Sequence, residues 1–287
     1  MLAVYKKELR GAFTSMFGYL FLTFLLALVG FYVYTFNLKL EYASIAYAIN
    51  SVTMFFLLLV PMLTMRILSE EKKQKTDQLL FTSPVSVTRI VIGKYLALVS
   101  ILLIAMLIIS VYPHILARYG TVNMKVAYSN IAAFFLLGCA YLAIGLFVSA
   151  LTESQIVAAI LTFIVILFTL LADALKGMIP SDHAISVLVL AVLVFILAGI
   201  AFLMMKNWFV FGGLLVVGYA VLFGLYFWKE TLYDGFLTKM LGWISLISRF
   251  DKFKYGLFDV AAYVYYLSIV FLFVFLTVQA IKKRRWS

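Results

Sequence analysis

Residues 66–94 read RILSEEKKQKTDQLLFTSPVSVTRIVIGK, the one strongly charged block between the two ends of an otherwise apolar chain. The 287-residue chain is 66% hydrophobic and only 12% charged, and its mean hydropathy is +1.12. These values lie far outside the usage of soluble globular domains. A charged block between apolar runs has to lie in water, because ionised groups are costly in the bilayer core. We therefore expect a multi-pass membrane protein in which this block meets a soluble partner.

The apolar runs around this block predict the fold. A helix needs about 20 residues, each rising about 1.5 Å, to cross about 30 Å of hydrocarbon. Eight such runs occupy residues 17–36, 46–67, 87–116, 127–151, 156–171, 184–205, 208–228 and 261–281. The fifth run is short and the third is long, and Pro61 and Pro113 can kink the second and third. The predicted fold is all-α: a bundle of about eight transmembrane helices that forms a single membrane domain over residues 1–287.

The distribution of charge predicts how this bundle is oriented. An even number of spans puts both ends on one side, and 14 of the 23 basic residues fall on that side with only five of the 12 acidic ones. Basic loops remain on the cytoplasmic side of a membrane. We therefore expect a protein of the cytoplasmic membrane with both termini and the charged block in the cytoplasm. Topology and attraction to anionic lipid account for the net charge of +11 without a nucleic-acid partner.

Two amphipathic segments accompany the spans. Near the start, apolar residues at helical spacing predict either an interfacial helix on the inner membrane face or a plain cytoplasmic start whose charges only orient the first span. These residues are Leu2, Tyr5, Leu9 and Phe13. A second segment at about 229–258 follows the seventh run, and it predicts an amphipathic helix on the outer face. Its apolar residues are Leu232, Phe236, Met240, Trp243, Ile247 and Phe250.

The chain offers few residues for catalysis. His114 and His183 both fall near the outer ends of spans, where an interfacial hydrogen bond is the expected role. The single Cys139 lies inside the fourth run, so no intramolecular disulfide can form. No GxxxxGK[ST] loop occurs for ATP phosphates, and no ionisable residue lies clearly in the middle of a run, as an ion relay would need. We expect no catalytic, cofactor-binding or metal-binding residue, and no enzymatic activity in this chain.

A short helix is predicted inside the charged block at residues 76–81. Thr76 is a suitable N-cap, Asp77 favours the positive end of the helix dipole, and Pro84 redirects the chain towards the third span. The apolar side of this helix consists of Leu79, Leu80 and Phe81. That side either enters a groove on a soluble partner or lies in lipid.

The run EEKKQKTDQLLFTSPVSVTRIVIGKYLA, residues 70–97, resembles the segment that joins the second and third spans of ABC-2 type transporter permeases. The matching residues are Glu70, Glu71, Thr76, Leu79, Leu80, Pro84, Gly93 and Lys94. Lys75 stands where the family usually has glycine, and Gln78 where it usually has glutamate. Lys7-Glu8-Leu9, Phe13 and Gly18-Tyr19 near the start also match. The end of the chain, with Arg285-Trp286, is similar to the gliding-motility-type branch, and the sixth and seventh spans are an extra pair beside the usual six.

The resemblance implies a permease subunit of an ATP-binding cassette transporter, an exporter, whose coupling helix docks on a separate ATP-binding subunit. ATP and Mg²⁺ would be bound by that subunit. A second permease copy or a paralogue would complete the complex, and an auxiliary extracytoplasmic subunit is allowed. In the coupling segment, residues 66–86, the implied ATPase-coupling residues are Glu70, Glu71, Thr76, Asp77, Gln78, Leu79, Leu80, Phe81 and Pro84.

Within that set, the leucines and Phe81 are expected to transmit force by packing, and Glu71 and Asp77 to supply charge complementarity. The alternative interpretation is an ion-coupled secondary transporter, or a membrane assembly scaffold without an ATPase partner. An ion-coupled carrier would transport without ATP, whereas an ABC permease requires the ATPase.

Overall fold

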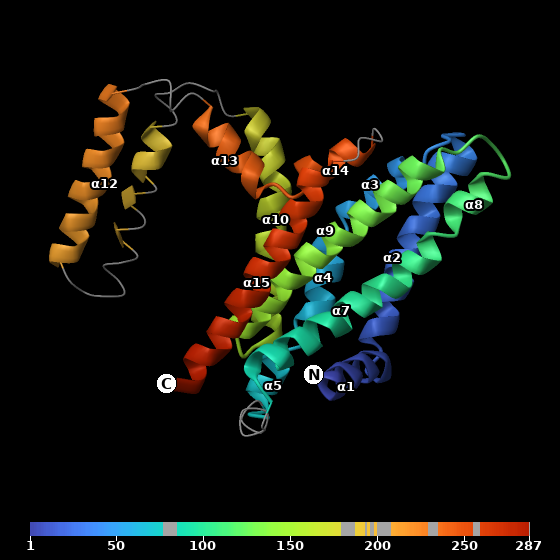
Figure 1. Cartoon of the computed structure of the whole chain (residues 1–287), viewed down its shortest axis with the longest axis horizontal. Coiled ribbons are helices and arrows are strands. Elements are labelled where there is room, and N and C mark those ends of the chain that lie inside the picture. The colour runs from blue at the N-terminus through green and yellow to red at the C-terminus, as the bar shows by residue number, and fades with distance from the viewer. Residues whose placement is uncertain are drawn as a thin grey trace. The chain divides into compact units, whose positions relative to one another are not determined.

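The computed structural model of the protein describes residues 1–76, 85–178, 187–192, 194–195, 198–199, 208–228, 235–254 and 259–286. Every regular element in these ranges is a helix, which confirms the all-α prediction. The chain divides into two compact units, one of Met1–Leu170 with Leu246–Ser287 and one of Leu171–Ser245. Figure 1 shows the chain with its helix labels. The organisation of residues 1–287 as a single membrane domain stays a prediction.

The first unit is a bundle arranged around α9 (Met124–Leu151), which packs against α4, α7, α14 and α15 (Figure 1). Its other elements are α1 (Leu2–Thr14), α2 (Phe17–Val33), the π-helix η1 (Tyr34–Lys39), α3 (Ala46–Thr53), α4 (Phe56–Thr64), α5 (Ser69–Lys73), α7 (Val87–Ile109), α8 (Tyr112–Leu116), most of α10 (Gln155–Met178), α14 (Ile247–Lys254) and α15 (Val260–Trp286). The second unit, taken by itself, holds the end of α10 with α12 (Trp208–Trp228) and α13 (Phe236–Ile244).

Small residues allow α9 to occupy the centre of the first unit. Within its most apolar window, 78% of α9 is buried, against 44% or less in the other long spans. A methyl group added at Gly138 would lie 2.6 Å from a Leu102 methyl carbon, and one at Gly145 would overlap the side chain of Thr64. Helix backbones approach closely where glycine removes the side chain. Gly138 and Gly145 therefore allow α9 to lie close against its neighbours.

Within the described residues, five helical stretches are long and apolar enough to cross a membrane, and a bent pair makes a sixth. The five are Phe17–Lys39, Val87–Leu116, Met124–Leu151, Gln155–Met178 and Val260–Lys283. The fifth predicted run, assigned to 156–171, was too short, because α10 continues to Met178. The seventh run coincides with α12, whereas most of the sixth lies outside the described residues. A count of about eight spans stays a prediction.

The second span is bent. α3 and the helical stretch that starts at Phe56 form an angle of 59° across a break at Met54 and Phe55. Pro61 lies inside α4 and cannot donate a hydrogen bond to Leu57. The break lies further towards the N-terminus, where Leu57 N–H and Leu58 N–H bond three residues back, to Met54 and Phe55. The bend is therefore a short stretch of tightened helix before the proline turn.

The outer amphipathic segment differs from its prediction. Instead of one helix, the described part forms α13 and α14, which are separated where Ser245 adopts an extended backbone with ψ of 112°. Trp243, assigned to the apolar side, is 67% exposed, while Phe250 and Phe253 of α14 are fully buried. A uniform helical period over 229–258 missed this interruption, because an isolated serine gives no strong turn signal.

The close contact between α4 and α9 makes Gly145 intolerant of any side chain. We expect Gly145→Ala to destabilise the protein by about 1–3 kcal/mol, the usual cost of overpacking, because the new methyl group overlaps the β-branched Thr64. The measurement is thermal unfolding in detergent followed by intrinsic fluorescence. Gly212→Ala is the matched control, since a methyl group at Gly212 meets nothing within 4 Å. Equal melting temperatures for the two variants would contradict the contact.

Candidate functional site

The helix α1 crosses the beginning of α7. The chain's start forms the helix that its apolar spacing predicted, and Leu9 and Phe13 pack against the hydrophobic core. Gly93 of α7 permits the crossing, because a methyl group there would lie 3.1 Å from the Met1 carbonyl oxygen and 3.3 Å from Val4 Cβ. The Tyr5 hydroxyl and the Ser100 hydroxyl, 3.0 Å apart, add a hydrogen bond between the two helices.

Lys94 lies at this crossing, and its side chain is fully buried. Its ammonium group is 2.7 Å from Glu8 Oε1 of α1 and 2.9 Å from Glu71 Oε2 of α5. It also donates to the Ile67 carbonyl oxygen at 3.0 Å. A lysine ammonium has three protons, so these three acceptors match its full donor capacity. One buried cation thereby joins α1, α5 and the segment after α4 to α7.

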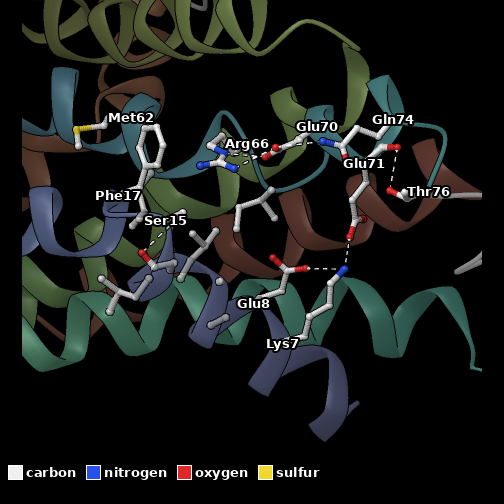
Figure 2. A pocket seen from close by; sticks show the side chains of 17 residues that line it. Lys7, Glu8, Ser15, Phe17, Met62, Arg66, Glu70, Glu71, Gln74 and Thr76 are labelled. Carbon is white, nitrogen blue, oxygen red and sulfur yellow. Dashed lines mark hydrogen bonds and ion pairs between the residues drawn. The ribbon is translucent and has the colours of Figure 1, made fainter.

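Lys7 is the fourth member of this arrangement, and we name Lys7, Glu8, Glu71 and Lys94 the Lys94 cluster. The Lys7 ammonium is 3.0 Å from Glu71 Oε1 and 3.9 Å from Glu8 Oε1, and Figure 2 shows its side chain reaching both carboxylates. The two carboxylates are nearly buried, with side-chain exposures of 14% and 13%. Two cations therefore balance two anions, of which Lys94 and the two carboxylates are shielded from water while the Lys7 side chain is 64% exposed.

The surroundings of Lys7 raise its pKa. Partial burial by itself lowers the pKa, but the hydrogen bond to Glu71 and the charges of Glu71 and Glu8 outweigh it, so the pKa lies above its ordinary value of 10.5. The stabilisation from this shift is complete below pH 10.5 and is lost only as the pH rises through the folded-state pKa. Lys7 is therefore charged throughout the physiological range.

The short helix α5 is also held by the end of α9. The Ser149 hydroxyl oxygen accepts hydrogen bonds from the backbone N–H groups of Leu68 and Ser69, both at 3.2 Å. α5 has no side-chain cap of its own, so Ser149 satisfies amides that its N-terminus leaves unpaired. In return, Lys72 donates to the Ala150 carbonyl oxygen near the end of α9. α5 is thus bonded to α1, α7 and α9 together.

α5 ends in a Schellman motif, which sets the direction of the following chain. Thr76 N–H donates to Glu71 C=O and Lys75 N–H to Lys72 C=O, the two bonds that define the motif. Lys75 takes the left-handed conformation, with φ of +56°. Glycine adopts that conformation without steric cost. The family's preference for glycine at this position thus has a backbone reason.

A pocket of about 360 Å³ opens beside the Lys94 cluster. At its mouth Arg66 donates to both carboxylate oxygens of Glu70, from Nε at 2.6 Å and from Nη2 at 3.0 Å. The guanidinium lies 4.7 Å from the centre of the Phe17 ring, and Figure 2 shows these three side chains along one edge of the pocket. The lining also includes apolar side chains, among them Met62, Leu63, Leu98 and Ile101.

The structure places only part of the predicted coupling set. Glu70 and Glu71 are engaged within the chain, as described, and the Thr76 hydroxyl donates to the Glu71 carbonyl oxygen at 3.4 Å. The remaining predicted residues lie outside the described part of the chain: Asp77, Gln78, Leu79, Leu80, Phe81 and Pro84. The predicted helix at 76–81 and its docking therefore stay predictions.

Sequence reasoning missed the central position of Lys94. It counted Lys94 as a cytoplasmic charge, and the structure instead buries it in α7, at the eighth residue of the Val87–Leu116 span. A signal was present, because an ionisable residue inside a predicted span indicates a functional or paired group. Of the two histidines, His114 accepts or donates a hydrogen bond with the Tyr128 hydroxyl at 2.9 Å, as expected, and His183 lies outside the described residues.

Comparison with known protein families gives a match over residues 2–180. The sequence profile of the family described as ABC-2 family transporter protein matches this range, which includes every helix that contributes to the Lys94 cluster. No curated protein and no solved structure matches the chain.

Removal of the Lys94 charge is expected to destabilise the protein. In Lys94→Met the carboxylates of Glu8 and Glu71 lose their buried counter-ion, and breaking a buried pair in this way costs about 3–5 kcal/mol. The measurement is thermal unfolding of the purified protein in detergent. Adding Glu71→Gln to Lys94→Met should restore part of the stability, because it removes one uncompensated charge.

Lys73→Met is the matched control for that variant, since Lys73 is exposed at the end of α5. Surface changes of this kind stay within about 0.5 kcal/mol. If Lys94→Met melted together with Lys73→Met, the burial and pairing of Lys94 would be wrong.

The left-handed backbone at Lys75 generates a second prediction. Lys75→Gly should raise stability by up to about 1 kcal/mol, because it relieves the steric cost of the positive φ. The same change at Lys73, inside α5, should lower it by about 0.5–1 kcal/mol. Thermal unfolding of both variants checks the opposite signs, and a loss of stability in Lys75→Gly would argue against the Schellman motif.

Proposed function

Because the chain belongs to the ABC-2 family of transporter proteins, we propose that it is the permease subunit of an ATP-binding cassette exporter. It would move cargo out across the cytoplasmic membrane with energy from ATP hydrolysed on a separate subunit, which binds the ATP and Mg²⁺. This chain supplies the membrane pathway and the coupling segment. The gliding-motility branch stays a prediction within that family.

The observation that best supports this proposal is the convergence of the family-pattern residues. Lys7-Glu8 comes from one matching stretch of the pattern and Glu71 and Lys94 from the two ends of another, and the four residues form one ion-paired group. That group fixes α5, which directly precedes the predicted coupling helix. A segment that receives force from a partner has to be connected rigidly to the helices that it moves. The hydrogen bonds from Ser149 and Lys72 extend this connection to α9.

The proposed mechanism follows from these connections. Closure of the ATP-binding subunits displaces the coupling helix at 76–81, whose Leu79, Leu80 and Phe81 occupy a groove on the ATPase. α5 passes the displacement to α1, α7 and α9, because it is bonded to all three. The bundle then shifts between an inward-facing and an outward-facing arrangement, which the ATPase favours through its different fit to the two.

The assembly and orientation belong to the same proposal. Two permease chains, identical or paralogous, pair with two ATP-binding subunits, with room for an auxiliary extracytoplasmic subunit. Both ends of the first unit's chain support one orientation, since α1 and the end of α15 lie at the same end as α5 (Figure 1). The excess of basic residues predicts that this end faces the cytoplasm.

An ion-coupled carrier is the weaker candidate. The acidic side chains nearest the membrane in the Lys94 cluster, Glu8 and Glu71, are both paired with lysine. A proton relay needs ionisable side chains along the transport pathway, and these two carboxylates instead join helices within the chain. The family match favours ATP as the energy source.

Affinity purification of the tagged chain from its native membrane tests the proposal. A P-loop ATPase should co-purify with the native sequence, and its recovery should fall at least about tenfold with Leu79→Asp and Leu80→Asp, because each charge would have to enter an apolar groove. Mass spectrometry of the purified complex measures the recovery. The matched control is the pair Leu79→Met and Leu80→Met, which conserves volume and apolarity.

The control pair should retain the ATPase. Absence of any ATPase with the native sequence in mild detergent, together with transport that a protonophore abolishes, would replace this proposal with the ion-coupled carrier. Absence of both the ATPase and transport would favour an assembly scaffold.

A further inference from the structure

Asn130, in the second turn of α9, is a fully buried polar side chain. Its exposed fraction is 0%, and neither its amide nitrogen nor its amide oxygen has a hydrogen-bond partner among the residues that the structure describes. Buried polar groups in native proteins are bonded to protein or to ordered water in the large majority of cases, because an unpaired one costs free energy. The amide of Asn130 therefore indicates a bound ligand.

The face of α9 that carries Asn130 is directed towards α4 and α14. Ala127 and Phe134 lie three positions before and four positions after Asn130, so the three side chains share one helix face. The centre of the Phe134 ring is 4.7 Å from that of Phe56 in α4 and 6.3 Å from that of Phe250 in α14. The Asn130 amide is thus on the side of α9 that these helices cover.

Asn50 of α3 lies level with Asn130. Residues 45–56 and 127–134 run side by side in the same direction, because their first residues line one pocket and their last residues are the stacked pair of phenylalanine rings. Asn50 and Asn130 are each near the middle of their stretch, and α3 packs against α9. The Asn50 amide nitrogen donates to Asp251 Oδ1 of α14 at 3.3 Å. Three polar side chains from three packed helices therefore converge at one level.

A pocket of about 280 Å³ opens between the chain segments that precede α3 and α9. It is lined by residues 43–45 and 121–123 with Val126 and Ala127. Ala127 is three residues from Asn130 on the same face, which corresponds to roughly 4.5 Å along the helix axis. The pocket is far larger than the volume of about 30 Å³ that one water molecule occupies in the liquid. Water can therefore come within one helical turn of the buried amide.

The chemistry of the three side chains favours water over an ion. A cation could bind the Asn130 oxygen and the Asp251 carboxylate, but it would leave the amide protons of Asn130 unpaired. An anion would be repelled by Asp251. A water molecule accepts as well as donates, so it can bond to the amide and the carboxylate together, and buried waters make about three such bonds.

We propose that Asn130, Asn50 and Asp251 hold at least one ordered water molecule, which bridges α9 to the bonded pair of α3 and α14. This inference does not rest on the proposed transport function, because the argument uses only burial, helix packing and hydrogen-bonding capacity. A bond through water is nearly as favourable as a direct one. The bridging water can also exchange its partners when α3 moves relative to α9, so that no buried amide is left unpaired.

X-ray radiolysis of the full-length protein in mild detergent, followed by mass spectrometry, detects such a water. The beam forms hydroxyl radicals from water at the site, and these oxidise the nearest aromatic rings. Phe134 and Phe250 lie beside the site and are fully buried, and Phe21 of α2 is an equally buried control. We expect Phe134 and Phe250 to be oxidised at least about tenfold faster than Phe21, because they adjoin a buried water.

Asn130→Leu tests whether the amide holds the water. This change conserves the approximate volume and removes both hydrogen-bonding groups, so oxidation of the two rings should fall to the rate of Phe21. Thr162→Val is the matched control, since it removes another fully buried polar group, a hydroxyl that donates to the Ala158 carbonyl oxygen at 2.7 Å. It should leave the oxidation unchanged. Melting temperatures verify folding, and the native measurement is decisive by itself if Asn130→Leu does not fold.

Three outcomes would overturn the proposal. Oxidation of Phe134 and Phe250 as slow as that of Phe21 in the native protein would mean that Asn130 is bonded within the chain. Fast oxidation that persists in folded Asn130→Leu would mean that the amide does not hold the water. A melting temperature that falls when sodium chloride is replaced by choline chloride, with loss of this dependence in Asp251→Asn, would identify a cation site.

Discussion

The buried ammonium of Lys94 is the interaction on which the arrangement of α1, α5 and α7 in the first unit depends. A cation without water is costly, and this one is stabilised only because three acceptors from α1, α5 and the chain after α4 surround it. None of these elements can leave without exposing an unpaired charge in a poorly hydrated place. The cluster therefore specifies a single arrangement of the crossing, whereas apolar contacts alone would tolerate sliding.

The contacts around Lys94 each help to bring its acceptors into place. Gly93 permits α1 to approach α7 closely enough for Glu8 to reach Lys94. Ser149 holds the beginning of α5, so that Glu71 faces the same ammonium, and the Schellman motif then ends α5 at Lys75. Local backbone chemistry and long-range ion pairing thus agree, as expected of a well-specified native structure.

Much of this fold could be predicted from the sequence, because hydropathy and charge distribution are local signals. The long apolar runs and the helical spacing at the start of the chain were visible in that way. The ion pairs were not, since Lys94 and Glu8 are 86 positions apart, and Lys7 and Glu71 are 64 apart. Composition gives no information about which charges meet.

The features that the sequence did not predict also have physical explanations. The interruption of the outer amphipathic segment depends on one extended residue, Ser245, for which periodicity has no signal. The bend of the second span precedes Pro61 instead of coinciding with it. Lys75 was noted as a departure from the family's glycine, but its left-handed conformation became evident only from the backbone.

The break at Met54 and Phe55 has a mechanical consequence. On one side of it, α3 is fastened to α14 by the hydrogen bond from Asn50 to Asp251. On the other side, α4 packs closely against α9 where Thr64 contacts Gly145. This contact restricts rotation of α4 relative to α9. Any change in the angle between these two fastened ends has to be absorbed by the two residues between them. Met54 and Phe55 are therefore the hinge between the two helical segments of the second span.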